Sequence, residues 1–397
     1  MPEPHVPTVF ERSRPGRRAG RLPAVDVPEQ PIESLVPAVL LRQEPPGLPE
    51  VAEPELIRHF TALSRRNFAI DVGFYPLGSC TMKHNPRINE RVAALPGFRG
   101  LHPLQRPEAA QGMLRVLFDL GEMLGEIAGL PATTLQPAAG AHGELTGLML
   151  ARAYHAERGE DAQRRRVLIP DSAHGTNPAS VTLAGYDVVR LGQNAEGGVD
   201  LDDLRAKVDD TVACLMLTNP STLGLFERDI VEVARVVHES GGLLYYDGAN
   251  LNPIMGVCRP GDMGFDIVHF NLHKSFSTPH GGGGPGAGAV AVTAELEPYL
   301  PRPVVRREGD RYLLDDDRPR SIGKIRSFYG NAGVAVRAYA YIRTLGPDGI
   351  REAAETAVLN ANYLMARLKE RYELPFDRTC MHEFVLSARE LKRRHGV

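Results

Sequence analysis

The chain of 397 residues carries a formal net charge of −3, with 43% hydrophobic and 24% charged residues. These are the proportions of an ordinary globular protein with room for a large core and more than one structural unit, and the charge gives no reason to expect a nucleic-acid partner. No apolar run is long enough to cross a membrane, and the four cysteines are scattered without the spacing of metal ligands, which favours the reducing cytoplasm.

The first 55 residues are rich in proline and show little periodicity. Their arginines are typical of an organellar presequence, but Glu3 and Glu11 interrupt them and the repeated prolines prevent an amphipathic helix. Apolar side chains such as Leu22, Val25 and Leu40 nevertheless need burial somewhere. We therefore predict an extended basic arm and linker over residues 1–70 that lies on the surface of a partner.

Residues 71–310 are predicted to form a large α/β domain. Helical periodicity covers about 108–129, and a second helix follows the small-residue turn at 137–143 and continues to about 158. Beyond it, short β-branched runs alternate with helices, one of which has apolar residues at i, i+3, i+4 and i+7 from Ile230. This alternation indicates a mostly parallel sheet, with candidate strands at 167–169, 187–189, 212–217, 243–246, 267–270 and 289–292.

Residues 311–397 are predicted to begin a second, smaller domain. The acidic turn at 315–317 is expected to lead into a helical segment, and the last candidate strand, 384–387, precedes a final helix. We expect this domain to be incomplete at Val397.

The residues of the large domain whose side chains could carry chemistry follow its strands, at 171–174, 218–221, 247–250 and 273–274. In parallel sheets the carboxyl ends of the strands share one edge, where ligands bind. We expect these four groups to converge there.

Asp247 and Lys274 are the most informative pair. Asp247 closes an apolar strand, and Lys274, one of six lysines in the chain, follows the next strand 27 positions later. Pyridoxal phosphate needs a lysine for its Schiff base and a carboxylate against its pyridinium nitrogen. The pair therefore predicts this cofactor, and the competing interpretation is a surface lysine and a turn aspartate.

Further cofactor contacts are predicted around this pair. Gly140 and Ala141 open a helix whose amides could hold a phosphate. His142 is then placed to stack on the pyridine ring, unless it is a surface histidine that caps its helix. His273 could reach the phosphate or be packed in the core, and Ala249 lies two residues after Asp247.

Ser172 and His174 follow a strand and could hydrogen-bond the phenolic oxygen of the cofactor or move substrate protons. The alternative is a turn stabilised by polar side chains. Asn219 could lie near the same oxygen or serve a turn of its own.

Two irregular segments complete the set of candidates. Residues 74–83 are too irregular for a helix and suit a loop that reaches a bound substrate, with a positioning role for Cys80. The glycines at 281–284 are not followed by the Lys-Ser or Lys-Thr of a nucleotide loop, so flexible backbone near the cofactor explains them.

Together these stretches resemble the P-protein of the glycine cleavage system, the pyridoxal-phosphate glycine decarboxylase. The chain is most similar to the second, cofactor-bearing subunit of its two-subunit bacterial form. Ser-Cys-Thr-Met-Lys at 79–83 and Asn-Leu-His-Lys at 271–274 are highly specific together, and the remaining matches are at 15–18, 75–78, 136–144, 171–178 and 246–250.

The resemblance implies a type I pyridoxal-phosphate fold like that of aspartate aminotransferase. Its central sheet would carry helices on both faces, and its smaller C-terminal α+β domain normally continues well beyond the end of this chain. It also implies glycine as the substrate, a heterotetramer with a sister subunit, and transfer of the aminomethyl group to a lipoylated carrier protein.

Two alternatives remain open. One is another pyridoxal-phosphate amino-acid decarboxylase of the same fold, which would protonate its carbanion. The other is a non-catalytic subunit that keeps the fold and the partners, although the intact pair of Asp247 and Lys274 argues against it.

Overall fold

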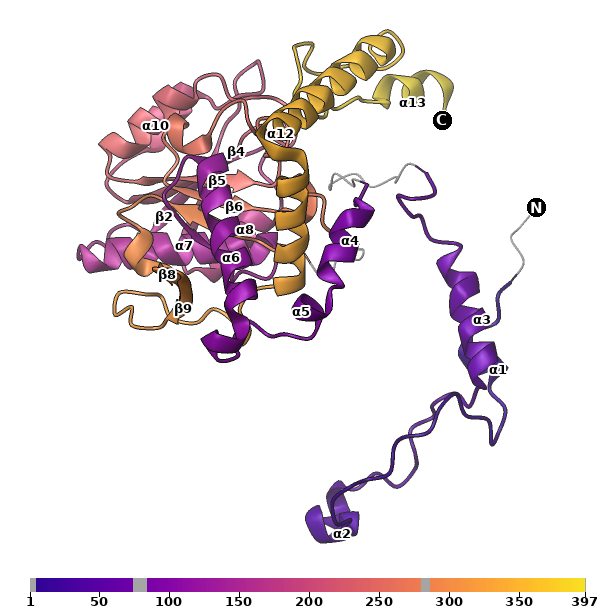
Figure 1. Ribbon diagram of the computed structural model, residues 1–397. Helices are drawn as coiled ribbons and strands as arrows, with labels where there is room; N and C mark the ends of the chain where they lie inside the picture. Colours follow the sequence, from indigo (N-terminus) through magenta and orange to yellow (C-terminus); the bar gives the residue numbers. More distant parts are fainter. Residues whose placement is uncertain (1–4, 74–83, 280–285, 397) are drawn as a thin grey trace. The chain divides into compact units, whose positions relative to one another are not determined.

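The computed structural model describes residues 5–73, 84–279 and 286–396. It divides the chain into two compact units, Met1–Met82 and Lys83–Val397 (Figure 1). The division that the sequence predicted, at residues 70 and 310, stays a prediction. Within the described ranges, no helix is both long and apolar enough to span a membrane.

The N-terminal unit has almost no core of its own. Of its described hydrophobic side chains, Val51 alone is buried, whereas Leu22 is 94% exposed and Val39 is 88% exposed. Polar contacts hold the backbone instead, among them the Gly16 amide on Glu50 Oε2 at 2.6 Å. Its helices are short except for the last: α1 (Val9–Arg12), α2 (Ile32–Leu35), η1 (Ala38–Leu40) and α3 (Glu53–Ser64).

A seven-stranded sheet is the centre of the second unit, in the order β1-β7-β6-β5-β4-β2-β3. Among these strands, β7 runs in the direction opposite to the other six, so the prediction of a mostly parallel sheet is confirmed. The three-residue β1 was not predicted, because so short a run leaves little periodicity to detect. The strands are β1 (Ala132–Thr134), β2 (Arg166–Pro170), β3 (Asp187–Leu191), β4 (Val212–Thr218), β5 (Leu243–Gly248), β6 (Ile267–Phe270) and β7 (Val290–Val292).

Helices cover both faces of this sheet. Successive side chains of a strand point to opposite faces of the sheet. Leu215 and Leu244 therefore pack in one hydrophobic core, and Cys214 and Tyr245 pack in the other. The first core is closed by α6 (Pro107–Ala128), α10 (Ile230–Glu239) and α12 (Ala332–Leu368), and Figure 1 shows α6 and α12 side by side. The second is closed by α7 (Gly140–Glu157) and α8 (Thr176–Leu183).

The predicted helical faces are confirmed. In α10, the residues Ile230, Val233, Ala234 and Val237 are all buried, each at most 5% exposed. Burial of such a side chain stabilises the fold by about 1.5–3 kcal/mol. The remaining helices are short: α4 (Arg87–Ala93), α5 (Pro96–Arg99), α9 (Leu201–Lys207), η2 (Pro260–Met263), α11 (Leu272–Ser275), η3 (Glu297–Tyr299) and α13 (Arg389–His395).

One expectation for the C-terminal region was wrong. The helix predicted after the acidic turn is present and begins at Ala332, and the turn itself lies at the end of a hairpin of β8 (Val304–Glu308) and β9 (Arg311–Asp315). Residues 384–387 form no strand and make one isolated bridge, from Ser387 to Glu373. An extended segment needs a paired neighbour to become a stable strand, and sequence periodicity does not provide one.

Candidate functional site

Four neighbouring parallel strands bring the predicted site residues to one edge of the sheet. The strands β2, β4, β5 and β6 are adjacent and run in the same direction. Ser172 and His174 follow β2, Asn219 follows β4, Asp247 lies near the end of β5, and Lys274 follows β6. The predicted convergence therefore occurs, because parallel strands end on the same side.

Asp247 is the most buried charged group of the site, with 1% of its surface exposed. Its Oδ2 accepts a hydrogen bond from Asn177 Nδ2 at 2.9 Å, and its Oδ1 accepts one from the Ala249 amide at 3.0 Å. The Nε2 atom of His269 lies 3.3 Å from Oδ1. Ala249, a predicted cofactor contact, thus supports the carboxylate through its backbone.

These contacts decide the charge of Asp247. Burial acts to raise the pKa of this carboxyl group, but His269, Asn177, the Ala249 amide and Lys274 together hold the pKa below its ordinary value. Because the pKa of Asp247 is lower in the folded state than in the unfolded state, its ionisation stabilises the fold at pH values above the unfolded-state pKa. This contribution is lost as the pH falls through the folded-state pKa. At neutral pH the interior therefore holds a carboxylate.

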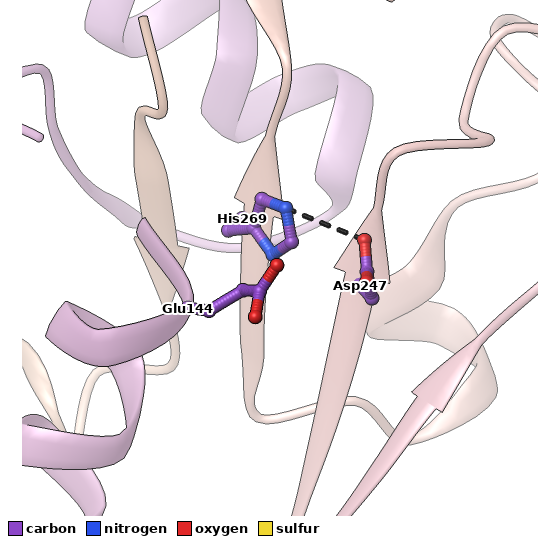
Figure 2. A group of neighbouring side chains, drawn as sticks. All are labelled: Glu144, Asp247 and His269. Atoms are coloured by element: carbon purple, nitrogen blue, oxygen red, sulfur yellow. Dashed lines mark ion pairs between the residues drawn. The ribbon is translucent and has the colours of Figure 1, made fainter. Parts of the chain in front are cut away.

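A second buried carboxylate, Glu144 of α7, lies beside this pair. Figure 2 shows Glu144, His269 and Asp247 facing one another, and one ligand atom from each lies within 4.8 Å of the others. Thr176 Oγ1 and Ser180 Oγ donate to the two oxygens of Glu144 at 2.7 and 2.8 Å.

The spacing of these three groups would also suit a metal ion. Both oxygens of each carboxylate already accept hydrogen bonds from hydroxyl or amide donors. His269 in turn contacts the hydroxyl of Tyr245 through Nδ1 at 2.9 Å. We therefore interpret the cluster as a hydrogen-bonded network that orients Asp247.

Lys274 lies on α11, the single turn that follows β6. It is half-buried, and its amide donates to the Asn271 carbonyl at 2.8 Å. The charge of its side chain acts to lower the pKa of Asp247, and it opposes the rise in the pKa of Glu383 that burial causes. The predicted lysine and carboxylate thus interact within one site.

The N-terminus of α7 lies against the turn that carries Lys274. The first intrahelical bond of α7 is made by the Gly143 amide to the Ala139 carbonyl, so the amides of Gly140, Ala141 and His142 precede it. A Cβ atom on residue 140 would collide with Asn271 Oδ1, so only glycine allows this close approach. The amides and the helix dipole make a suitable phosphate site.

His142 is held as a neutral ring. Its Nδ1 accepts the Ala138 amide at 3.1 Å, and a hydrogen bond joins the ring to the backbone of Ile325. Burial and the charge of Arg326 lower its pKa, outweighing the bond to Ile325. An uncharged, fixed imidazole is what a stacking partner of an aromatic ring requires.

His174 is connected to the same network. Its Nδ1 accepts the Thr176 amide at 3.2 Å, so the neutral ring carries its proton on Nε2. Thr176 links it to Glu144, because its amide donates to His174 and its hydroxyl donates to Glu144. The carbonyl oxygen of Ser172 accepts the Thr222 hydroxyl at 2.5 Å, which ties the loop after β2 to the loop after β4.

Asn219 and His273 are the remaining predicted site residues that the structure describes. The side chain of Asn219 is fully buried, and its Oδ1 accepts the Glu227 amide at 2.9 Å, which favours its alternative role in a turn. His273 lies against Gly286. Residues 74–83, with Cys80, and the glycines at 281–284 lie outside the described residues.

The site fits the predicted cofactor. Beside Lys274, the hydroxyls of Ser275 and Thr278 are buried and have no hydrogen-bond partner in the part of the chain that the structure describes. Buried hydroxyls of this kind need an acceptor or donor, and the phosphate of pyridoxal phosphate would supply one. The ionised Asp247 would face its ring nitrogen.

Sequence reasoning missed four residues of this arrangement: Glu144, Asn177, His269 and Glu383. His269 had a detectable signal, because it is a polar residue at an inward position of an apolar strand. The other three carry no such signal, because their roles depend on contacts with residues distant in the chain.

Comparisons with known proteins show which family the chain resembles. Residues 25–312 match the family model of the glycine cleavage system P-protein. A probable glycine dehydrogenase (decarboxylating) subunit 2 of Halalkalibacterium halodurans is 60% identical over 385 residues, which are 97% of this chain and 79% of the relative. Its counterpart in Caldanaerobacter subterraneus subsp. tengcongensis is 59% identical over 379 residues, 96% of this chain and 78% of the relative.

Solved structures confirm the type I pyridoxal-phosphate fold. An inhibitor-bound glycine decarboxylase (P-protein) of the glycine cleavage system is similar with a TM-score of 0.75 and 25% identity, over 90% of this chain and 82% of that chain. A TDC of Oryza sativa with PLP and tryptamine has a TM-score of 0.62 at 15% identity, over 86% and 74% of the two chains. The latter likeness concerns the fold alone.

Replacing His269 with alanine should destabilise the fold by about 3 kcal/mol, because it leaves a buried carboxylate without its imidazole partner. Urea unfolding measures the loss. The matched control is His238→Ala. His238 pairs with Asp266, the residue directly before β6, at 2.9 Å, and 41% of its side chain is exposed. That variant should lose no more than about 1 kcal/mol. Equal losses would contradict a special role for the buried pair.

Proposed function

The chain belongs to the glycine cleavage system P-protein family, and from this membership we propose that it is the cofactor-bearing subunit that decarboxylates glycine. The cofactor is pyridoxal phosphate, held through Lys274. The observation that carries the proposal is the buried carboxylate of Asp247, which accepts a hydrogen bond on each oxygen and lies one strand away from Lys274.

Each predicted residue has a part in this proposal. Lys274 Nζ bonds to the cofactor and could return as a base, while Asp247 keeps the ring nitrogen protonated. His142 stacks on the ring, the amides of Gly140 and Ala141 bind the phosphate, and His174 holds or moves a proton at Nε2. When bound, the cofactor supplies a ring that takes up the electron pair left as glycine loses carbon dioxide.

Three further contacts of the cofactor are proposed around this core. Ser172 lies close to the phenolic oxygen and His273 close to the phosphate. Asn219 acts on the cofactor only through the loop after β4, since its side chain is bonded within that loop.

The proposed overall reaction also involves partners. Glycine and the lipoyl disulfide of a carrier protein give carbon dioxide and an aminomethyl group on one lipoyl sulfur, while the other sulfur becomes a thiol. A sister subunit completes a heterotetramer, and we place the reaction in the cytoplasm. The exposed apolar side chains of the N-terminal unit are the surface that supports a partner subunit.

Exchange of labelled bicarbonate into the carboxyl group of glycine tests the reaction. With the sister subunit present, we expect exchange that depends on the lipoylated carrier. Release of methylamine without the carrier would indicate a decarboxylase that protonates its product. Absence of both reactions in a cofactor-loaded assembly would indicate a non-catalytic subunit.

Replacing Lys274 with alanine should abolish covalent cofactor binding and all turnover, because Nζ makes the bond. Borohydride reduction followed by peptide mass spectrometry measures the cofactor on the chain. Lys207→Ala is the control, since Lys207 pairs with Asp203 on a surface helix at 2.8 Å. Cofactor still fixed to the polypeptide of the Lys274 variant would disprove the assignment.

Replacing Asp247 with asparagine should leave the cofactor bound but raise the decarboxylation barrier by about 3 kcal/mol, on the order of a hundredfold in rate. The reason is that the ring nitrogen loses its charge partner. Single-turnover kinetics with saturating cofactor measure the effect. Asp171→Asn, an exposed carboxylate at the end of β2, should change the rate little. A near-normal rate for the Asp247 variant would exclude the role in electron storage.

Deleting residues 1–50 should prevent assembly with the sister subunit. Side chains such as Leu22, Val39 and Leu40 are between 72% and 94% exposed, and burying each would contribute about 1.5–3 kcal/mol. Light scattering of the mixed subunits measures the mass. Leu40→Glu should weaken assembly, whereas Glu44→Gln, four residues away, should not. An intact, active assembly from the truncated chain would show that the arm is dispensable.

A further inference from the structure

Asn331 occupies the N-cap position of α12, but its side chain makes no capping hydrogen bond. An asparagine at this position ordinarily accepts a hydrogen bond from an amide of the first turn, which stabilises the helix. Here the backbone carbonyl of Asn331 serves α12 instead, accepting the amides of Val334 and Ala335 at 2.9 and 3.0 Å. The side chain is therefore available for a role outside its own helix.

The side-chain amide of Asn331 joins two other segments of backbone. Its Nδ2 atom donates to the Ala138 carbonyl at 2.9 Å and also to the Gly286 carbonyl. Its Oδ1 atom accepts a hydrogen bond from Arg326 Nη1 at 3.1 Å. These partners fix the orientation of the amide, because the reversed amide would place Oδ1 against two carbonyl oxygens and Nδ2 against a guanidinium donor.

The first of these segments leads into the phosphate site proposed at the N-terminus of α7. Ala138 lies two residues before α7 begins, and its own amide donates to His142 Nδ1 at 3.1 Å. The residue before Asn331 fits closely against the same loop, because Gly330 has a φ of +60° and a Cβ atom there would collide with the carbonyl oxygen of Leu135. The side-chain amide thus holds the chain directly ahead of the first amides of α7.

The second segment lies against the turn that carries Lys274. A Cβ atom on Gly286 would collide with the ring of His273, the neighbour of Lys274. Two residues further along, the Gly288 amide donates to the Pro137 carbonyl at 3.1 Å, so the two segments are also bonded to each other. The helix α12 itself packs against α11. The same side-chain amide therefore joins the backbone beside the phosphate site to the backbone beside Lys274.

A bound phosphate depends on such support, an argument that rests on the proposed cofactor. Backbone amides hold a phosphate well only when their N–H groups already converge on it, because amides that have to be ordered on binding give a weaker site. Since a peptide group is planar, holding the Ala138 carbonyl also fixes the amide that follows it. The buried hydroxyls of Ser275 and Thr278, which suit the same phosphate, lie on the Lys274 side of the site. The distance between the two groups of donors therefore depends on the bridge.

We propose that Asn331 is a positioning residue of the phosphate site: its side-chain amide keeps the first amides of α7 at a fixed distance from the hydroxyls that follow Lys274. It acts on the phosphate through the backbone of Ala138 and Gly286. The competing possibility is that the bridge only anchors α12. In that case its loss would weaken the fold and affect every ligand of the site alike.

Comparison of pyridoxal phosphate with pyridoxal, which lacks the phosphate, separates these two roles. In the full chain, Asn331→Ala should bind pyridoxal phosphate about tenfold more weakly, the effect of one lost hydrogen-bonded support, and should bind pyridoxal with unchanged affinity. Asn331→Asp should lose as much, because a carboxylate accepts from Arg326 but cannot donate to the two carbonyls. Asn360→Ala, which alters an exposed asparagine of the same helix, should keep both affinities. Visible absorbance of the Schiff base measures the affinities, and circular dichroism confirms that each variant is folded.

Inorganic phosphate provides a second measurement on the cofactor-free full chain. It should raise the midpoint of thermal unfolding of the unaltered chain and of Asn360→Ala more than that of Asn331→Ala, because a ligand of the folded state stabilises it.

The outcomes distinguish the inference from the function on which it rests. Equal losses of affinity for the two pyridoxal compounds, unchanged binding of pyridoxal phosphate by Asn331→Ala, or equal shifts with inorganic phosphate would overturn the inference alone. Covalent capture of the cofactor by Lys274→Ala would instead refute the proposed function. An unaltered chain with no preference for pyridoxal phosphate over pyridoxal would refute the phosphate site itself.

Discussion

The site depends on keeping one carboxylate ionised inside the protein. Transferring such a charge from water costs several kcal/mol unless hydrogen bonds and opposite charges replace the lost hydration. Asp247 obtains this replacement from α8, the turn after β5, β6 and α11. Because each of these elements contributes one partner, the charge is tolerated only when the whole sheet and its helices are assembled.

Strand alternation explains where the polar network lies. Tyr245 and Asp247 of β5, like Ile267 and His269 of β6, point to the face that α7 covers. The tyrosine and isoleucine pack in the apolar core of that face, while the acid and the histidine lie one step further toward the carboxyl ends of the strands. The same face therefore changes from hydrophobic core to functional site within two residues.

Two carboxyl groups at this edge of the sheet differ in the direction of their pKa shifts because their surroundings differ. Burial raises the pKa of both, but Asp247 has donors on both oxygens and an imidazole beside it, so its pKa falls. Glu383 has one amide donor and the charge of Lys274, which do not overcome burial. The same burial therefore has opposite outcomes for the two pKa values, because the donors and charges around each acid differ.

The sequence alone determined the α/β class, the helical faces, and the positions of Asp247 near the end of its strand and of Lys274 after its strand. These features depend on local periodicity and on the shared edge of parallel strands, both of which a linear pattern records. Only the tertiary structure decided that Asn177 and His269 support Asp247, and that Glu383 meets Asn250 from 133 positions away. Hydrogen-bond partners and burial in the interior are set by contacts between distant segments, for which the sequence holds no local signal.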